Sequence, residues 1–315
     1  MPITVTVIIL LTSWLVESSC PPPEKIYPCT CFGFEMVCSN MHSHDDLIYP
    51  IQATVKKSVY LLRIYNSKLM YIPSGIFKDT NYREIYFTGT ELTSFSDSDV
   101  AFSGLEHSLN GIFISNIQYV DRWDWSQLSN LLKLQRLVVS QSTMYSIDQA
   151  ITMPLISSLS FTQARISFIY DKAFSALENM MTLVLQGNKI NELKRSMFPK
   201  PCHLQYLDLS ENQLQRLPED LFVDMPRLLT LKLGKNKIAS LSEREFSLPM
   251  KQVAWLFIEE NPIRCDCRMS WIVSSRKPSI FRGHCRYPEN LKGVPITNLT
   301  TSQLWCSNSK LSIKS

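Results

Sequence analysis

The stretch that decides the fold is LQYLDLSENQLQRLP, residues 204–218. Its spacing of leucine and asparagine returns 24 residues later in LLTLKLGKNKIASL, residues 228–241, and stands 24 residues earlier in MMTLVLQGNKINEL, residues 180–193. Self-similarity at a fixed period indicates a repeat protein, in which each unit buries its apolar side chains against its neighbours. The 315 residues therefore predict one elongated array rather than two or three separate globular domains.

Extending the pattern in both directions gives nine candidate units, which begin at Val59, Tyr82, Leu109, Leu134, Ile156, Met180, Leu204, Leu228 and Val253. The last four keep the asparagine, at Asn188, Asn212, Asn236 and Asn261. The first five replace it with Ser67, Thr90, Ile117, Ser142 and Ala164. A carboxamide both donates and accepts hydrogen bonds where the backbone leaves a strand, so we expect the C-terminal half to be the more stable. The third unit, 109–130, contains Trp123 and Trp125 and fits the pattern least well.

The consensus L-x-x-L-x-L-x-x-N-x-L resembles the leucine-rich repeat. That resemblance implies an α/β solenoid: a curved horseshoe with a parallel sheet on its concave side. Side chains alternate along a strand, so the two leucines of x-L-x-L-x point inward and the x residues point outward. Five phenylalanines recur in the second half of the units and are expected in the core: Phe77, Phe174, Phe198, Phe222 and Phe246. The alternative, amphipathic helices with leucines at this spacing by chance, does not account for four successive copies.

The N-terminus predicts the cellular compartment. An apolar run from Ile3 to Val16 is followed by the small residues Ser18 and Ser19, so residues 1–19 are predicted to be a signal peptide of a secreted, extracellular protein. The alternative is an uncleaved anchor, but the run is shorter than the roughly 20 residues that a span needs. The polar tail 307–315 and the absence of a later long apolar run predict no membrane span. A net charge of +4 is too small to indicate a nucleic-acid partner.

Eight of the nine cysteines form two clusters at the ends of the array. We expect residues 20–58 to form an N-terminal cap, residues 59–264 the repeats, and residues 265–306 a C-terminal cap. Each cluster of four allows three pairings. Zinc binding is the alternative, but C-x-C spacing is atypical of zinc sites and a secreted chain favours disulfides. The ninth cysteine, Cys202, is expected to be a semi-buried free thiol, with an intermolecular bridge as the alternative.

Both clusters resemble the caps of extracellular leucine-rich repeat proteins. Cys29-Thr30-Cys31 is similar to the N-terminal cap, and the segment from Asn261-Pro262 to Cys265-Asp266-Cys267, followed by Trp271, is similar to the opening of the C-terminal cap. In that family the first cysteine pairs with the third and the second with the fourth. The resemblance thus implies the pairs Cys20–Cys31, Cys29–Cys38, Cys265–Cys285 and Cys267–Cys306.

The whole chain resembles secreted animal leucine-rich repeat proteins, a group that includes Slit segments and the Nogo receptor and Toll ectodomains. The opening segment, from Cys20 to Asn40, is also similar to arthropod proteins related to the non-catalytic subunit of Oplophorus luciferin 2-monooxygenase. That second resemblance implies a secreted protein that accompanies or binds another protein and performs no chemistry itself.

Motifs of catalysis are missing from the sequence. It contains no G-x-S-x-G, no H-E-x-x-H and no P-loop, so we predict no enzymatic activity, no catalytic residue and no cofactor. The segment from His42 to Asp46 offers metal-ligand types, but a solvated loop is the better interpretation. The sequon Asn298-Leu299-Thr300 predicts a glycan on Asn298.

Aromatic residues at outward positions predict a binding surface. We expect a partner on the concave face, at Tyr60, Tyr65, Tyr86, Phe113, Tyr206, Trp255 and Phe257. The alternative is that the protein's own loops cover these rings. The favoured function is a secreted scaffold for an extracellular protein partner, including the role of non-catalytic subunit. The alternative is a matrix, adhesion or guidance ligand of cell-surface receptors, and a homo-oligomer is left open.

Overall fold

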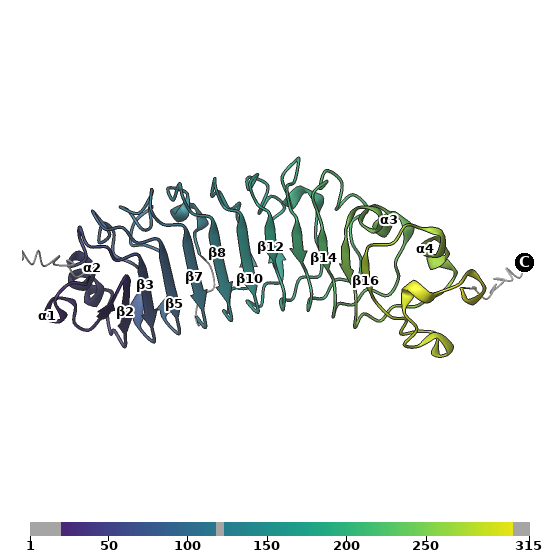
Figure 1. The fold of residues 1–315 in the computed structure, drawn as a ribbon, viewed down its shortest axis with the longest axis horizontal. Helices are drawn as coiled ribbons and strands as arrows, with labels where there is room; N and C mark the ends of the chain where they lie inside the picture. Colours follow the sequence, from purple (N-terminus) through teal and green to yellow (C-terminus); the bar gives the residue numbers. More distant parts are fainter. Residues whose placement is uncertain (1–19, 118–122, 305–315) are drawn as a thin grey trace, which may run out of the picture.

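The computed structural model describes residues 20–117 and 123–304. The predicted signal peptide, Cys306 and the polar tail lie outside these ranges. The described chain forms an elongated arc whose strands lie side by side along its length (Figure 1). Its main sheet, as far as these residues go, has the strand order β1-β2-β3-β5-β7-β8-β10-β12-β13-β14-β15-β16. The predicted leucine-rich repeat solenoid is confirmed.

Each of the nine predicted units contributes one strand, which begins two residues after the first residue of the unit. These strands are β3 (Leu61–Tyr65), β5 (Glu84–Thr88), β7 (Gly111–Ser115), β8 (Arg136–Ser140), β10 (Ser158–Thr162), β12 (Thr182–Val184), β13 (Tyr206–Asp208), β14 (Thr230–Lys232) and β15 (Trp255–Phe257). All of them pair in parallel, with equivalent positions opposite each other, as Leu207 lies opposite Leu183 and Leu231. The inward residues are buried along the whole array, so one continuous core runs between the two ends.

The two caps add three strands that the repeat pattern did not predict. At the N-terminal end β2 (Glu35–Ser39) pairs in parallel with β3, and β1 (Thr30–Phe32) pairs antiparallel with β2. At the other end β16 (Ile280–Arg282) pairs in parallel with β15. The caps therefore cover the ends of the core and also lengthen the concave sheet on both sides.

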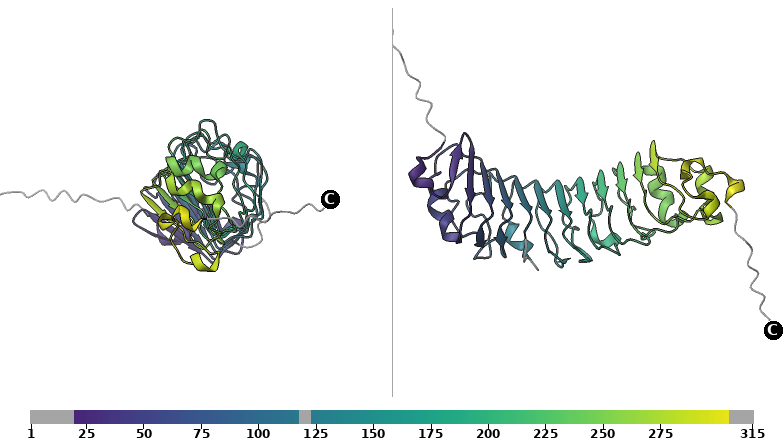
Figure 2. Two further views of the ribbon diagram at one scale, coloured as in Figure 1. Left: turned by 90° about the vertical axis from the view of Figure 1, so that its right-hand side faces the viewer. Right: turned by 90° about the horizontal axis from the view of Figure 1, so that it is seen from below.

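The convex side is built from short elements, and the strands line the concave side of the arc (Figure 2). Two small parallel pairs lie there, β4 (Lys68–Met70) with β6 (Glu91–Leu92) and β9 (Ser146–Ile147) with β11 (Phe168–Ile169).

Helices are short throughout the described residues. The α-helices are α1 (Pro23–Ile26), α2 (Ile48–Gln52), α3 (Glu243–Gln252) and α4 (Ser270–Ser274). The 3₁₀ turns are η1 (His44–Leu47), η2 (Trp125–Leu128), η3 (Arg195–Met197), η4 (Cys267–Met269), η5 (Glu289–Leu291), η6 (Ile296–Asn298) and η7 (Thr301–Gln303). The five predicted core phenylalanines are all buried.

The asparagines of the last four units form a continuous buried ladder. Asn212 accepts a hydrogen bond from the backbone N–H of Ile190, at 3.1 Å, and donates to the carbonyls of Leu185 and Leu209. Asn188, Asn236 and Asn261 repeat the same arrangement in their own units. Each carboxamide thus joins two successive units through groups that would otherwise be buried without a partner.

The first five units lack this ladder. Ser67 accepts from the N–H of Met41 and donates to the carbonyl of Tyr65, so it replaces part of the asparagine's bonding. Ser142 is buried and its hydroxyl has no hydrogen-bond partner among the described residues. Ile117 and Ala164 carry no polar side-chain atom at all. The units of the N-terminal half are therefore held together by the apolar core and by contacts between side chains on the outer face of the sheet.

The irregular third unit places its tryptophans in the core. Trp123 and Trp125 are buried, with ring centroids 5.7 Å apart in an edge-to-face arrangement. Trp125 also packs on Phe161, at 5.4 Å, and Trp123 donates its indole N–H to the carbonyl of Leu92. The strand β7 of this unit keeps its register with both neighbours, so the large rings fill the convex half without shifting the sheet.

A row of residues in the left-handed conformation follows the strands. It contains Asn40 of the N-terminal cap and one residue from each of the nine units, and most are not glycine: Asn66, Gly89, Asn116, Gln141, Gln163, Gly187, Glu211, Lys235 and Glu260. The N–H of each residue from Asn40 to Lys235 donates to a carbonyl in the next unit, as that of Gln141 does to Thr162 at 2.9 Å. These hydrogen bonds hold residues other than glycine in the left-handed conformation, which is about 1–2 kcal/mol per residue less favourable for them than the right-handed one.

This row gives a test of backbone strain. We expect Gly89→Ala to lower the free energy of unfolding by about 1–2 kcal/mol, because φ is +63° and the new methyl would lie 2.7 Å from Oδ1 of Asn66. The reciprocal change, Gln141→Gly, starts from φ +50° and should leave stability unchanged or raise it by up to about 1 kcal/mol. Urea titrations of both variants would measure this. Equal effects of the two changes would show that the row carries no strain.

Disulfides close both ends of the array. Cys20 is bonded to Cys31 and Cys29 to Cys38 in the N-terminal cap, and Cys265 is bonded to Cys285 in the C-terminal cap. Cys267 is also in a disulfide. Because Cys306 lies outside the described residues, the link Cys267–Cys306 stays a prediction. Cys202 is a free thiol with 1% of its surface exposed, and burial raises its pKa.

Candidate partner-binding surface

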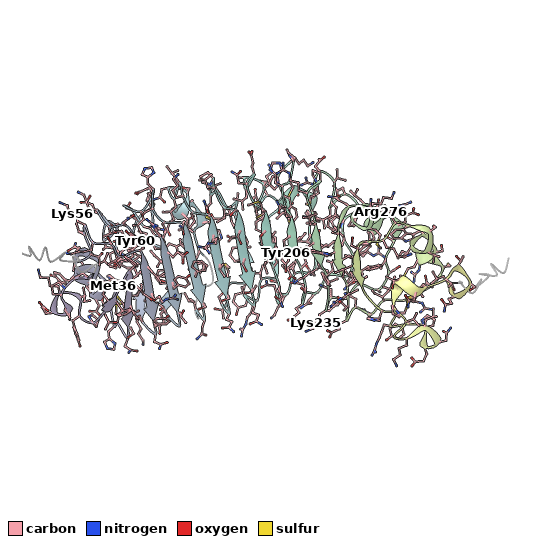
Figure 3. All side chains as sticks on the ribbon, viewed as in Figure 1. Met36, Lys56, Tyr60, Tyr206, Lys235 and Arg276 are labelled. Atoms are coloured by element: carbon pink, nitrogen blue, oxygen red, sulfur yellow. A yellow bond between two sulfur atoms is a disulfide. The ribbon has the colours of Figure 1, made fainter. Side chains whose placement is uncertain are left out.

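One outward residue from each strand lies in a central row along the concave sheet. The register places in this row Val37, Arg63, Tyr86, Phe113, Val138, Ser160, Val184, Asp208, Lys232, Phe257 and Arg282. Two clusters of rings and charges flank a centre of small side chains. Figure 3 shows Tyr60 and Tyr206 in the two different halves of the molecule.

The N-terminal cluster is a stack of four side chains from four adjacent strands, Arg63, Tyr86, Phe113 and Arg136. The rings of Tyr86 and Phe113 are nearly parallel, at 10°, with centroids 4.4 Å apart. The guanidinium of Arg63 lies 4.2 Å from the centroid of Tyr86, and that of Arg136 lies 5.3 Å from the centroid of Phe113. Both rings are half-buried, and each has a ring on one face and a guanidinium near it.

Two carboxylates hold the stack in place. Glu35 accepts a hydrogen bond from the guanidinium of Arg63, and Glu84 forms an ion pair with Arg136 and accepts a hydrogen bond from the Tyr86 hydroxyl. Partial burial, and then the hydrogen bond to Glu84, raise the pKa of the Tyr86 phenol. Charge-assisted contacts of this kind fix side-chain rotamers, so the surface is ordered before any partner arrives.

Two further tyrosines of the predicted site lie beside this stack rather than in it. Tyr60 precedes β3 and is half-buried between Phe34, whose centroid is 5.5 Å away, and the guanidinium of Arg83 at 4.3 Å. Tyr65 lies two residues beyond Arg63, opposite Thr88 of the next strand. The predicted residues of the N-terminal half thus lie together on β3, β5 and β7 or directly before β3. The positions of the aromatic residues in the sequence do not predict that arginine side chains pack on the rings.

The C-terminal cluster is centred on a buried acid. Asp208 is only 3% exposed, although it occupies an outward position. It accepts from the hydroxyl of Tyr206 at 3.0 Å and pairs with Lys232 at 3.4 Å, and Lys232 lies 5.1 Å from the ring of Tyr206. The contact with Tyr206, and then the charge of Asp208, raise the pKa of Lys232 despite partial burial, so its ammonium stays charged at neutral pH.

Trp255 is the most exposed of the predicted partner-binding residues. Its side chain is 46% exposed, whereas the other six predicted residues are half-buried. On the same strand Phe257 points to the same side, and the guanidinium of Arg282 lies 5.7 Å from its ring. Trp255 lies opposite Ile280 of β16, which the sequence analysis did not single out because the cap strand was not predicted.

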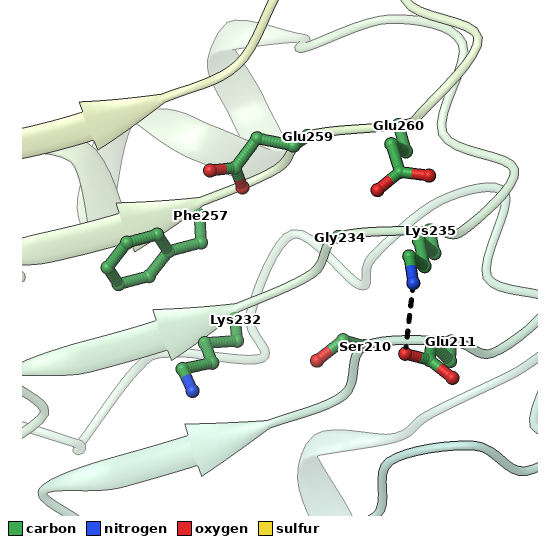
Figure 4. Close-up of a pocket in the computed structure, with 8 residues that line it drawn as sticks. All are labelled: Ser210, Glu211, Lys232, Gly234, Lys235, Phe257, Glu259 and Glu260. Carbon is green, nitrogen blue, oxygen red and sulfur yellow. Dashed lines mark hydrogen bonds and ion pairs between the residues drawn. The ribbon is translucent and has the colours of Figure 1, made fainter.

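A shallow pocket opens where β13, β14 and β15 end (Figure 4). Its volume is about 430 Å³, and we call it the β13–β15 pocket. The residues that line it are Ser210, Glu211, Lys232, Gly234, Lys235, Phe257, Glu259 and Glu260. Lys235 and Glu211 form an ion pair of 3.3 Å across it.

The remaining candidate residues lie apart from this surface. Asn298 of the sequon is exposed in the C-terminal cap, and its glycan stays a prediction. In the segment 42–46, Asp46 accepts from the N–H groups of His42 and Ser43, and His44 contacts Tyr71 at 2.8 Å. Over the two described ranges, no group of three potential ligands is placed to hold a metal ion, and no helix is long and apolar enough to cross a membrane.

Sequence comparisons match the repeats. The leucine rich repeat family model matches residues 154–214 and 202–263. Mouse podocan is 28% identical over 165 residues, which is 51% of this chain and 26% of podocan. Mouse Toll-like receptor 9 is 26% identical over 178 residues, which is 54% of this chain and 17% of the receptor. Trophoblast glycoprotein of Macaca fascicularis is 29% identical over 140 residues, 42% of this chain and 33% of that protein. The chain thus spans a third or less of these relatives' lengths.

Solved structures match nearly the whole chain, with sequence identities that support the fold alone. The structure of an octameric complex of latrophilin 3, Unc5D and FLRT2 (LRR) contains a chain with a TM-score of 0.63 and 17% identity, over 89% of this chain and 98% of that one. Human 5T4, trophoblast glycoprotein, gives a TM-score of 0.55 and 17% identity, over 91% and 99% of the two chains. With its repeat sheet and its disulfide-bonded N-terminal end, the chain has the leucine-rich repeat fold, and its sequence is similar to those of podocan and trophoblast glycoprotein.

Proposed function

We propose that this chain is a secreted, non-enzymatic scaffold that binds an extracellular protein on the concave face of its sheet. The observation that carries the proposal is the order of that face: rings and cations from successive strands hold one another at 4.2–5.7 Å in two clusters. Aromatic and arginine side chains that are already immobilised lose little conformational entropy on binding. The disulfides of both caps support an oxidising, extracellular compartment.

The finer proposal is that the partner is a catalytic protein and this chain its non-catalytic subunit. It rests on the similarity of the segment 20–40 to proteins related to the Oplophorus subunit. Co-purification of the secreted protein from its native extracellular fluid, followed by mass spectrometry, tests it. A soluble enzyme recovered in fixed stoichiometry would support the subunit role.

Removal of one ring should weaken binding of the co-purified partner. We expect Tyr86→Ala to raise the Kd by about tenfold or more, because it deletes the ring between Arg63 and Phe113 and leaves both side chains free to move. Tyr86→Phe keeps the stack and should bind nearly normally. Surface plasmon resonance with the purified partner measures both.

Two controls separate the concave face from the rest of the surface. Ser160→Ala lies in the central row but removes little area, and Lys194→Ala removes an exposed ion pair with Asp171 away from the sheet. Both should change the Kd by less than twofold. If Lys194→Ala weakens binding while Tyr86→Ala and Phe113→Ala do not, the partner binds outside the concave face.

The second candidate function is a matrix, adhesion or guidance ligand of cell-surface receptors. The matches to proteins named as a receptor and as a glycoprotein favour it. The two candidate functions predict that the secreted protein is recovered in different places. A subunit stays in solution with its partner, whereas a matrix or receptor ligand is retained on cells or matrix.

A further inference from the structure

The β13–β15 pocket owes its space to a glycine. Gly234 directly precedes Lys235 of the left-handed row, and Ser210 and Glu259 occupy the equivalent positions of the two neighbouring units. A methyl group built on it would lie 3.4 Å from the Glu259 backbone oxygen and 3.9 Å from its Oε2 atom. Its backbone is not in the left-handed region, so the position accepts other residues without strain. The glycine therefore leaves room for a foreign side chain beside the Glu259 carboxylate.

The pocket has an excess of negative charge. Each of its lysines already has an acidic partner, Lys232 with Asp208 at 3.4 Å and Lys235 with Glu211 at 3.3 Å. Glu259 and Glu260 form no ion pair within the described part of the chain. Two carboxylates are thus left uncompensated at the rim of a pocket that a cation would fit.

The wall of the pocket favours an organic cation. Phe257 lines it with an aromatic ring that already has one guanidinium beside it, that of Arg282 at 5.7 Å, and rings and carboxylates together favour a guanidinium or ammonium group on an aliphatic stem. A metal ion would need more ligands, and no group of three potential metal ligands is assembled in the residues that the structure covers. The chemistry that fits is therefore an arginine or lysine side chain.

An exposed apolar strip lies at the start of β15 and β16, whereas the pocket lies at the end of β15. Trp255 is 46% and Ile280 40% exposed, and the two lie opposite each other on β15 and β16. Glu259 follows Trp255 by four positions and lies just past the end of β15, a separation that corresponds to about 13 Å of extended chain. In an extended partner segment, side chains four residues apart span this distance and point the same way.

We infer that the β13–β15 pocket receives an arginine or lysine of the partner protein, while Trp255 and Ile280 contact an apolar side chain four residues away in the same extended segment. This inference rests on the proposed function, since it specifies the partner of the same concave face. It places a charge-specific anchor in the C-terminal half of the sheet, where the sequence analysis identified only aromatic residues.

Selection from a random dodecapeptide library displayed on phage tests the inference, with the full secreted chain as the target. Aligned on their shared pattern, the enriched peptides should have an apolar residue and, four positions away, one position at which Arg or Lys is at least fivefold more frequent than in the starting library. A synthetic peptide of the enriched sequence should bind at least tenfold more weakly to the double variant Glu259→Gln, Glu260→Gln. Replacement of the basic residue of the peptide by citrulline should also weaken its binding to the wild-type chain at least tenfold.

Matched variants keep the result interpretable. Gly234→Leu fills the pocket without changing charge and should also abolish the preference for a basic residue. The exposed carboxylate Glu192, away from the pocket, serves as the control: Glu192→Gln should bind the peptide as the wild type does. Circular dichroism would verify that each variant is folded. Enrichment without a basic residue, equal binding to the double variant, or no enrichment over an unrelated target would overturn the inference.

The outcomes also separate this inference from the proposed function. If Tyr86→Ala weakens binding of the co-purified partner while the double variant Glu259→Gln, Glu260→Gln does not, the concave face binds a partner. The inference that the pocket receives a basic side chain is then wrong. If neither set of variants changes the binding of that partner, both proposals fail.

Discussion

Asn212→Ala is expected to lower the free energy of unfolding by about 3 kcal/mol, or to unfold the units around it first. The carboxamide is buried and satisfies one N–H and two carbonyls in two adjacent units. Alanine leaves the N–H of Ile190 buried without a partner, and such a group costs about 1–3 kcal/mol in addition to the lost bonds to the carbonyls. Chemical denaturation measures the total, and hydrogen exchange locates it.

The matched control lies in the degenerate half. Ser142 occupies the same position of its unit, and its buried hydroxyl has no partner among the described residues. Ser142→Ala should therefore be neutral or stabilising by up to about 1 kcal/mol. In the wild type, exchange should be slower at 207–209 and 231–233 than at 112–114, because a linear array opens first at its weaker units. Equal losses for the two variants would contradict a stabilising role of the ladder.

Trp125→Ala should be the most damaging single change in the N-terminal half, with a loss of about 3–5 kcal/mol. The side chain is 1% exposed and packs against Phe95, Trp123 and Phe161 at centroid distances of 5.4–5.8 Å. Truncation removes a large apolar area and leaves a cavity that a solenoid unit cannot close without moving its neighbours. Thermal unfolding, followed by tryptophan fluorescence and circular dichroism, measures the loss.

Trp255→Ala provides the comparison, because it deletes the same atoms from a half-exposed site on the sheet. It should cost less than about 1 kcal/mol in stability and should weaken partner binding instead. Trp125→Phe should recover part of the lost stability. If the two tryptophans prove equally important for folding, the third unit does not depend on its aromatic core.

The structure of the regular units could be predicted closely because the residue type at each position of the repeat has a single physical explanation. Leucines that alternate with polar residues, and an asparagine at the turn, predict the strands, their register and the buried hydrogen bonding of Asn212. The cap strands β2 and β16 could not be predicted in this way. Their inward residues, such as Met36 and Phe281, belong to segments without the repeat spacing and join the sheet by extending its hydrogen bonding.

The aromatic residues predicted at outward positions do face the concave side, where Tyr86 lies opposite Phe113, but their role in binding a partner stays a prediction. The arginines that flank these rings, Arg63 and Arg136, were not predicted to contact them. Whether an arginine extends into solvent or folds over a ring depends on rotamers and on the carboxylates nearby, which periodicity does not encode. The left-handed row also escaped prediction, because its residues include glutamine, glutamate and lysine, which seldom adopt positive φ.

The stack from Arg63 to Arg136 has a consequence for how the molecule can diversify. Each of its contacts crosses a boundary between units, and it lies in the half that lacks the asparagine ladder, so the same side chains brace the array and present its surface. Changes there alter folding and recognition together. In the C-terminal half the ladder holds the units from inside, which leaves outward positions such as Trp255 and Gly234 free to change. New specificities, natural or engineered, should therefore arise over β13–β16 at the smaller cost in stability.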